Sequence, residues 1–243
     1  MSTPLKLALI GYGKMGQLIE QLAIEKGHNV VAKVHSKSTD ADWESVKNAD
    51  VAIEFTQPEA AVNNIKKCFS LHIPVVVGTT GWYQHLDEIK HLQSASQSAL
   101  LTASNFSIGV NVFFKINQLL AHIMDPINGY DVSLQEIHHI HKKDAPSGTA
   151  ITLAEGILKS YSKKQQWKLK EASNSEHDLP IEALRIDNVP GTHAITYSSA
   201  IDSIEIKHTA HNREGFALGA VIAAEWLAGK QGVFTMKDVL NFK

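Results

Sequence analysis

Ionisable side chains are concentrated between Glu136 and Ala150, where the chain reads EIHHIHKKDAPSGTA. Three histidines and two lysines fall between His138 and Lys143. Imidazole and ammonium groups attract carboxylates, and either can donate a proton near neutral pH. We therefore expect a site that binds an anion and contains an acid.

The same histidines also suggest a metal site, because imidazole nitrogens bind zinc. The adjacent lysines raise the electrostatic cost of a dication, however, and no cysteine or carboxylate completes an evident ligand set. A third interpretation is that the histidines only pack or form hydrogen bonds within a strand. We expect no metal and favour the anion site, because packing alone does not account for all three rings.

The stretch Pro146-Ser147-Gly148-Thr149 is predicted to begin a helix, with the proline in its first turn. The first N–H groups of a helix can bind a carboxylate end-on. Gly148 lets a ligand approach the backbone, and the Thr149 hydroxyl adds a donor.

His138 and Lys142 are the two candidates for the acid, and the sequence leaves the choice between them open. In an extended strand their side chains share a face but stand roughly 13 Å apart. One small ligand can contact both only if the chain bends, so we predict a bend near His141.

A second motif, Gly11-Tyr12-Gly13-Lys14-Met15-Gly16, has the G-x-G-x-x-G spacing, follows an apolar run and precedes an amphipathic one. In this pattern the glycines allow a tight turn, close approach of a pyrophosphate and close packing of helix on strand. The motif predicts a dinucleotide site. The end of the second predicted strand, Val34-His35-Ser36-Lys37, has no carboxylate for ribose hydroxyls, while Ser36 and Lys37 could bind a 2′-phosphate. This favours NADPH over NADH, unless Lys37 only belongs to a solvated turn.

Other strand ends are expected to line the same crevice, because ligands of open α/β sheets bind beyond the carboxyl ends of the strands. Their small and hydroxylated residues suit a nicotinamide ribose, although each could also be ordinary turn chemistry. These cofactor candidates are Phe55, Thr56, Gly78, Thr79, Thr80, Ala103, Ser104, Asn105 and Phe106.

The first hundred residues alternate short apolar runs with amphipathic stretches, which is typical of βαβ units in a parallel sheet covered on both faces. We predict an α/β fold, with a Rossmann-type dinucleotide-binding domain over 1–107, completed by about 214–243. A smaller α+β domain over 108–213 is expected to bind substrate and form the oligomer. The polar stretch 160–178 is predicted to be a loop or frayed connection.

The composition of the chain argues against several other classes of protein. The 243 residues are 44% hydrophobic and 20% charged, with a formal net charge of −2, which argues against a generally basic nucleic-acid binder. Cys68 is the single cysteine, so no internal disulfide forms and a reducing cytoplasm is expected. The N-terminal residues show no secretion signal, and no apolar run approaches the roughly 20 residues needed to span a membrane.

The segment 136–150 resembles the signature of the dihydrodipicolinate reductase family, E-[IL]-H-H-x-x-K-x-D-A-P-S-G-T-A, at every specified position. The similarity covers nearly the whole chain. It extends through the glycine loop, EFTQP, GTTGW, SNFSIGVN and PGTHAITY to the region around Arg213.

This resemblance implies a homotetrameric cytoplasmic enzyme of the diaminopimelate route to lysine. Such an enzyme passes a hydride from NADH or NADPH to C4 of 4-hydroxy-tetrahydrodipicolinate, a cyclic imine with two carboxylates, as hydroxide is lost. His138 and Lys142 would be the catalytic pair. The substrate carboxylates would be held by His139, Lys142, Ser147, Gly148 and Thr149.

The chain departs from the family in being short, in having Ile10 where many members have glycine, and in having His35 in place of a common acidic residue. These departures leave the choice between NADH and NADPH open. Two other interpretations remain: another NAD(P)-dependent dehydrogenase of a small carboxylated substrate, and a non-catalytic NAD(P) sensor. The anion cluster argues against the first, and the intact His138 and Lys142 against the second.

Overall fold

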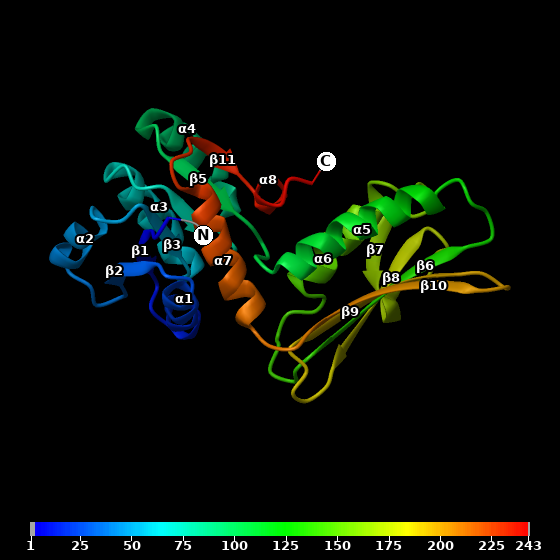
Figure 1. The fold of residues 1–243 in the computed structure, drawn as a ribbon. Helices are drawn as coiled ribbons and strands as arrows, with labels where there is room; N and C mark the ends of the chain where they lie inside the picture. Colours follow the sequence, from blue (N-terminus) through cyan, green and yellow to red (C-terminus); the bar gives the residue numbers. More distant parts are fainter. Residues whose placement is uncertain (1–2, 243) are drawn as a thin grey trace. The chain divides into compact units, whose positions relative to one another are not determined.

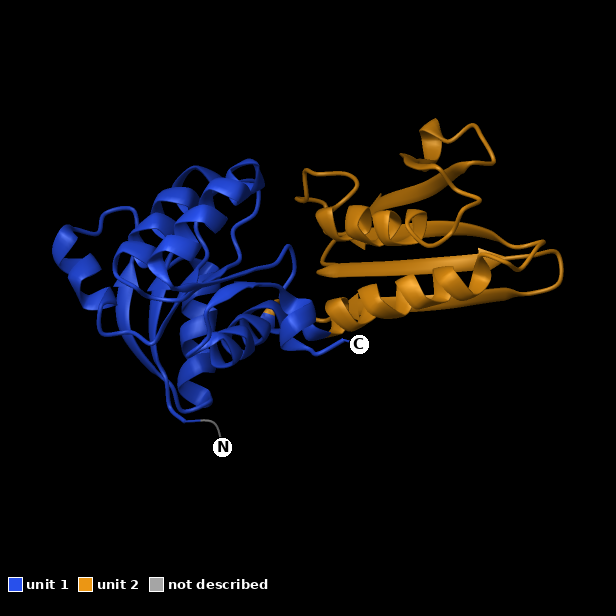
Figure 2. Cartoon of the chain, turned by 90° about the horizontal axis from the view of Figure 1, so that it is seen from above, with its two compact units in different colours: residues 1–108, 214–243 blue, residues 109–213 orange. Residues whose placement is uncertain are grey.

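The structure is a computed structural model that describes residues 3–242 (Figure 1). The chain divides into two compact units, which Figure 2 distinguishes by colour: residues 1–108 with 214–243, and residues 109–213. Within the described residues one sheet has six strands and the other has five. The predicted combination of a Rossmann-type parallel sheet and a second α+β unit is confirmed.

The first unit follows the predicted alternation of strands and helices. Its strands are β1 (Lys6–Ile10), β2 (Asn29–Val34), β3 (Val51–Glu54), β4 (Val75–Val77), β5 (Ala99–Thr102) and β11 (Gly232–Phe234). Its helices are α1 (Lys14–Glu25), α2 (Asp40–Val46), α3 (Pro58–Ser70), the 3-10 turn η1 (Tyr83–His85), α4 (Leu86–Ser96), α7 (Glu214–Leu227) and α8 (Met236–Val239). The strand order is β11-β5-β4-β3-β1-β2, and all pairs are parallel.

Helices cover both faces of this sheet, which explains the nearly continuous apolar strands. Alternate residues of β1 enter different cores: Leu7 and Leu9 pack with α1 and α7, whereas Ala8 and Ile10 pack with α2, α3 and α4. The carboxyl ends of β1 to β5 lie along one edge as a result of the parallel order, so the loops that follow them gather there.

The second unit is a mixed sheet with helices on one face, and in Figure 1 α5 and α6 lie along it. Its elements are α5 (Ile108–Met124, which begins at the last residue of the first unit), β6 (Asp131–His138), α6 (Gly148–Leu158), β7 (Gln166–Leu169), the 3-10 turn η2 (Lys170–Ala172), β8 (Asp178–Arg185), β9 (Gly191–Ser198) and β10 (Ser203–Ala210). The order is β10-β9-β6-β8-β7, with β6, β7 and β8 parallel and β9 antiparallel to both neighbours.

Two local predictions were wrong. The stretch 160–178 contains β7, which pairs in parallel with β8, so it is not only a loop. Pro146 does not occupy the first turn of α6, because Ser147 is the N-cap and its hydroxyl accepts the N–H of Ala150 at 3.2 Å.

Within residues 3–242, no helix is both long and apolar enough to cross a membrane.

Candidate active site

The glycine loop between β1 and α1 has the geometry that its spacing predicts. Gly11 has φ of +98°, and a Cβ there would lie 2.0 Å from the Phe55 carbonyl oxygen. A Cβ on Gly16 would lie 2.2 Å from the Gly11 carbonyl oxygen. A side chain at either position would therefore collide with backbone, which accounts for the first and third glycines of the motif.

Gly13 is different, because a Cβ there would meet no atom within 4 Å. It is the N-cap of α1, and no side chain caps the helix. The first N–H groups of α1, at Lys14, Met15 and Gly16, therefore begin beside open space. An uncapped helix N-terminus with room for an anion fits a dinucleotide pyrophosphate.

A cleft of about 620 Å³ lies beside this loop. It is lined by predicted cofactor residues from three strand ends: Gly11, Tyr12, Gly13, Ser36, Phe55 and Thr56. A smaller cavity of about 240 Å³ shares Phe55 and Thr56 and adds Met15, Gly78, Thr79 and Thr80. Lys14, Gly16 and Lys37 line neither space. Trp43 and Asn64 line the larger cleft, and sequence reasoning missed both, because nothing near them marks a ligand site.

The loops after β3 and β4 are tied together beneath this cleft. The Thr56 N–H donates to the Thr79 hydroxyl at 2.7 Å. The Glu54 carboxyl is buried, and that burial raises its pKa, while the Thr56 hydroxyl and the Asn64 amide donate to it. The predicted hydroxyl residues thus fix the shape of the crevice as well as line it.

The loop after β5 carries the last four predicted cofactor residues, Ala103 to Phe106. Phe106 is buried, with its ring centroid 5.8 Å from that of Phe55. The Asn105 side-chain oxygen accepts the N–H of Ser107 at 2.9 Å. A Cβ on Gly219 in α7 would lie 1.8 Å from the Phe106 carbonyl oxygen, so α7 holds this loop closely. None of Ala103 to Phe106 lines the two cavities described above.

In the second unit, the buried face of β6 changes from apolar to ionisable along the strand. Val132 and Leu134 belong to the core, and Glu136 and His138 follow at the same period of two. Glu136 lies opposite His193 in the antiparallel β6–β9 pair, so all three ionisable side chains share one face. The last two inward side chains of β6, Glu136 and His138, therefore belong to an ionisable cluster and not to the apolar core.

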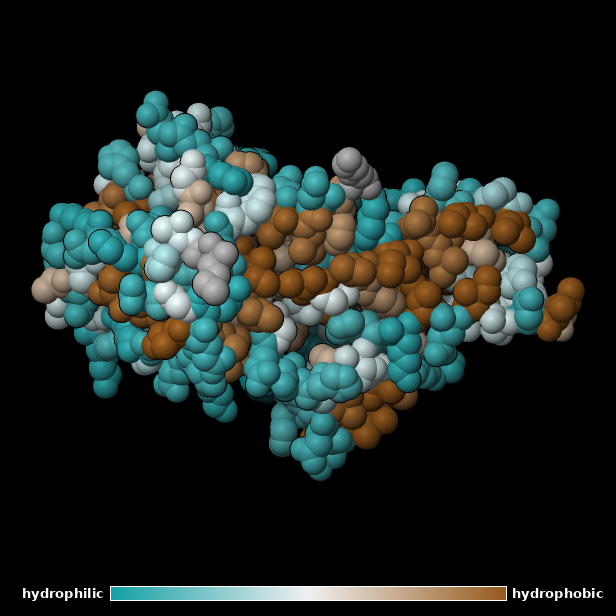
Figure 3. Space-filling model, viewed as in Figure 1, coloured by the Kyte–Doolittle hydropathy of each residue, from teal (hydrophilic) through white to brown (hydrophobic). Residues whose placement is uncertain are grey.

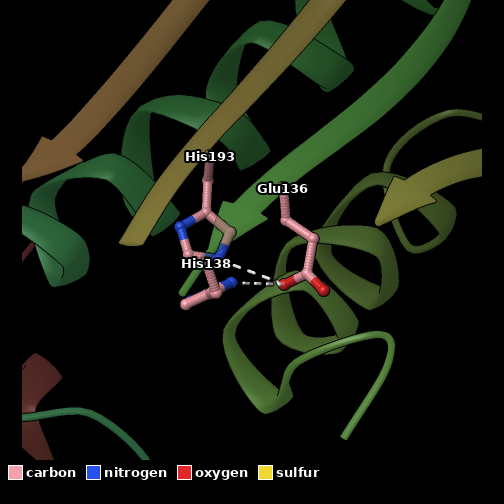
Figure 4. Close-up of side chains that lie close together, drawn as sticks. All are labelled: Glu136, His138 and His193. Carbon is pink, nitrogen blue, oxygen red and sulfur yellow. Dashed lines mark ion pairs between the residues drawn. The ribbon is translucent and has the colours of Figure 1, made fainter. Parts of the chain in front are cut away.

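Glu136, His138 and His193 meet at this end of the sheet (Figure 4). Glu136 Oε2 lies 3.3 Å from His138 Nδ1 and 3.7 Å from His193 Nε2. The two imidazole rings meet edge to face, with centroids 5.1 Å apart. The other carboxylate oxygen, Oε1, accepts the Ser147 N–H at 3.1 Å and the Arg185 Nη2 at 3.2 Å.

These contacts set the charges of the cluster. Burial alone would raise the pKa of Glu136, but the interactions with His138 and Ser147 outweigh it and lower this pKa to about 2. Burial, and after it the charge of His138, lowers the pKa of His193 to about 4. At neutral pH Glu136 is therefore a carboxylate and His193 a neutral imidazole.

The predicted bend is present directly after β6. The Lys142 N–H donates to the His139 carbonyl at 3.0 Å, which closes a turn over residues 139–142. The Lys142 ammonium binds both oxygens of Asp144, at 2.7 and 2.8 Å. Arg185 fixes the loop by donating to the carbonyls of Lys142, at 3.3 Å, and Asp144, at 2.5 Å.

The N-terminus of α6 follows this loop. Ser147 is buried, and its hydroxyl lies 3.3 Å from His193 Nε2. Gly148 is exposed, and a Cβ there would meet no atom within 4 Å. Thr149 is half-buried beside it. Open space at the first residues of a helix, close to imidazoles and an ammonium, suits a carboxylate ligand.

His139 and His141 do not join the buried cluster. Their rings lie 6.2 Å from each other, and His141 is exposed. Burial lowers the pKa of His139, and the charges of Arg213 and His141 lower it further. The cations around His139 suit an anion rather than a metal ion.

Among the described residues, Glu136, His138 and His193 bring three possible metal ligands within 4.8 Å of one another. The carboxylate already binds the Arg185 guanidinium, and Lys142 acts electrostatically on His193. These positive charges oppose a dication, so the cluster fits an acid held by a carboxylate better than a metal centre.

Sequence reasoning missed Glu136, His193 and Arg185 as site residues. One signal was available for Glu136, which stands two residues before His138 and so shares its face of a strand. His193 and Arg185 lie on strands β9 and β8, and their proximity depends on strand register, which the sequence pattern does not reveal.

Comparison with known proteins places both units in one family. Residues 5–106 match the model of the dihydrodipicolinate reductase N-terminus, and residues 109–240 match that of the C-terminus. A 4-hydroxy-tetrahydrodipicolinate reductase of Christiangramia forsetii is 51% identical, with 98% of each chain covered. One from Neisseria meningitidis is 32% identical, also with 98% of each chain covered.

Solved structures show the same fold. A dipicolinate-bound dihydrodipicolinate reductase from Paenisporosarcina sp. TG-14 superposes with a TM-score of 0.79 at 22% identity, covering 96% of this chain and 98% of that one. An amine dehydrogenase from Mycobacterium smegmatis gives a TM-score of 0.57 at 10% identity, covering 95% of this chain and 94% of that one. Both structural likenesses concern the fold alone, whereas the family models and the sequence identities, which cover nearly the whole chain, show the family. The chain belongs to the dihydrodipicolinate reductase family.

Proposed function

We propose that this protein reduces 4-hydroxy-tetrahydrodipicolinate to tetrahydrodipicolinate in the diaminopimelate route to lysine. The net reaction consumes one hydride from NADH or NADPH and one proton, and it releases water. The observation that carries the proposal is the buried imidazole of His138, paired with Glu136 and followed along the chain by Lys142 and the open N-terminus of α6. This combination supplies an acid and several carboxylate-binding groups.

The nicotinamide cofactor supplies the hydride when it is bound. Gly11 to Gly16 would hold its pyrophosphate at the N-terminus of α1, where Gly13 leaves space. Ser36 and Lys37 would contact the adenosine ribose or its phosphate. Phe55 with Thr56, Gly78 to Thr80 and Ala103 to Phe106 would line the remainder of the site. The site would accept either NADH or NADPH, because the residues after β2, His35-Ser36-Lys37, include no carboxylate that would repel a 2′-phosphate.

The substrate carries two carboxylates, and the second unit offers donors for both. Gly148 and Thr149 would bind one through the N–H groups of α6, beside the Ser147 cap. His139 and Lys142 would bind the other, with Lys142 exchanging its partner Asp144 for the substrate. His138 would supply the proton that the net reaction consumes.

We further propose that the chain forms a homotetramer through the second unit. Val112, Ile116, Leu119 and Ile123 are exposed at helical spacing on one face of α5, and Figure 3 shows the resulting apolar row. Analytical ultracentrifugation should give a mass four times that of the 26.7 kDa chain. A cytoplasmic location suits both the biosynthetic reaction and the buried thiol of Cys68.

The test is loss of NADPH absorbance on addition of freshly generated 4-hydroxy-tetrahydrodipicolinate. We expect turnover with this substrate and none with small 2-oxo acids, which other dehydrogenases of this fold would reduce. Absence of oxidation with the cyclic imine would overturn the proposal. Oxidation with a different carboxylated substrate would favour the alternative dehydrogenase.

A further inference from the structure

We propose that Glu136 and His193 are positioning residues for His138, holding its ring with Nδ1 toward Glu136 so that Nε2 is the nitrogen that meets the substrate. This rests on the proposed function, because it takes His138 as the acid. The inference goes beyond the signature, because His193 lies outside it and Glu136 has no assigned role there.

One carboxylate oxygen of Glu136 faces the imidazole of His138. Its Oε1 atom is occupied by Arg185 and Ser147, so only Oε2 is available to an imidazole. Oε2 and His138 Nδ1 are both buried, and within the described residues neither has a hydrogen bond to another group. The two atoms lie 3.3 Å apart, and a small rotation of the ring would align them as a hydrogen bond.

His193 restricts the His138 ring from the side. Its imidazole packs edge-on against His138 at an interplanar angle of 74°. Burial keeps this ring neutral at pH 7 by lowering its pKa, so it adds contact without adding a second cation. The Ser147 hydroxyl, 3.3 Å from His193 Nε2, in turn limits the movement of His193.

The opposite edge of the His138 ring lies beside Gly191. A Cβ on Gly191 would lie 3.1 Å from His138 Nε2, so a glycine at this position leaves room beside the nitrogen. A proton on Nδ1 faces Glu136 in both the neutral and the charged ring. The proton that leaves is therefore the one on Nε2. It ends in the water released as the C–O bond breaks, while the hydride pair forms the new C–H bond and the ring becomes neutral.

Two pairs of variants test the role of each residue. Glu136→Gln is compared with Glu182→Gln, the same change on β8 at the other face of the sheet. His193→Gln is compared with His208→Gln, on the strand position opposite His193. We expect kcat to fall about 10- to 100-fold for Glu136→Gln and by a smaller factor for His193→Gln, since positioning supplies part of the effect of an acid. The substrate KM and the Kd for NADPH should stay within about twofold, and both controls should match the wild type.

Nitrogen-15 NMR of histidine-labelled protein supplies a readout that a merely structural role would not move. In the wild type, neutral His138 should be the tautomer with its proton on Nδ1, and Glu136→Gln should convert it to a mixture. The His138 signal is identified by its loss in His138→Gln. An Nε2–H tautomer in the wild type would contradict the proposal.

Other results would also overturn it. Unchanged kcat in both variants would remove the positioning role, and a fall in kcat with an unchanged tautomer in Glu136→Gln would show that Glu136 acts on the fold alone. If Glu136→Gln does not fold, the wild-type tautomer of His138 and the kcat of His193→Gln still test the positioning role. The NMR readout needs no turnover. An inactive wild type would thus overturn the proposed function, whereas a wrong tautomer would overturn only this inference.

Discussion

Arg185 on β8 joins Glu136 on β6 to the loop that carries Lys142, because its guanidinium contacts Glu136 Oε1 at 3.2 Å and the Asp144 carbonyl at 2.5 Å. The carboxylate is fully buried, and the arginine side chain is 20% exposed. One side chain thus supports both the carboxylate beside His138 and the turn after it.

Replacing this arginine should destabilise the protein and the loop together. We expect Arg185→Gln to cost about 3 kcal/mol of unfolding free energy in urea, because Glu136 would lose its guanidinium partner in a buried site. Lys170→Gln removes the partner of the more exposed Glu182, so it should cost less than about 1 kcal/mol. Equal costs for the two variants would contradict the assigned role of Arg185.

Stability should fall in acid, and His193 should account for part of the loss. In the unfolded chain a histidine binds its proton near pH 6.5, but burial delays protonation of folded His193 to about pH 4. The unfolded state therefore gains protons first, and stability falls as the pH drops from 6.5 to 4, by about 3 kcal/mol at most. Urea unfolding of His193→Gln across this range should show a shallower loss, and identical slopes would refute the explanation.

Substitutions of two glycines in the nucleotide loop should distinguish an effect on NADPH binding from an effect on folding stability. Gly13→Ala adds a methyl group where no atom lies within 4 Å, so its melting temperature should match the wild type while NADPH binding weakens about tenfold or more. Gly16→Ala places a Cβ 2.2 Å from a backbone oxygen and should lower the melting temperature. Calorimetry and fluorescence titration measure both effects. Normal NADPH affinity in Gly13→Ala would argue against a pyrophosphate at that position.

His138 and Lys142 should affect turnover rather than cofactor binding. We expect His138→Gln to lower kcat about 100-fold or more, as loss of a general acid does. Lys142→Ala should lower kcat/KM mainly by raising the substrate KM, because it removes a carboxylate partner. In both variants the Kd for NADPH should be unchanged. Full activity of either variant would remove that residue from the site.

Replacement of Lys37 tests whether this residue favours NADPH over NADH. Its side chain does not line the 620 Å³ cleft, whereas Ser36 does, so the lysine would act on a 2′-phosphate from the rim. Lys37→Ala should then raise the KM for NADPH about tenfold and leave the KM for NADH within about twofold. An equal change for both cofactors would indicate a solvated turn with no part in recognition.

Much of the first unit could be predicted because its local signals agree. Apolar strands, amphipathic helices and the glycine motif each point to the same parallel sheet, and the structure follows them within a few residues. The second unit was harder, because β7 is an edge strand whose residues Trp167 to Leu169 are only half-buried. Its pattern resembles that of a loop for that reason.

Part of the candidate site could likewise be predicted from the sequence, and part could not. His138, Lys142 and the start of α6 are neighbours in sequence, and the signature carries them together. His193 comes 57 positions after Glu136, and only the register of β9 on β6 places it opposite that carboxylate. Burial of Glu136 depends on the same register, so the support for His138 could be found only in the folded chain.

Hydride transfer to C4 of a dicarboxylated cyclic imine is the step that defines the proposed function. The most direct test supplies NADPH carrying deuterium at the transferred position, together with freshly generated 4-hydroxy-tetrahydrodipicolinate, and analyses the product by mass spectrometry and NMR. We expect tetrahydrodipicolinate with a single deuterium at C4 and a matching loss of NADPH. Product without deuterium, deuterium at another carbon, or no oxidation of NADPH would contradict it.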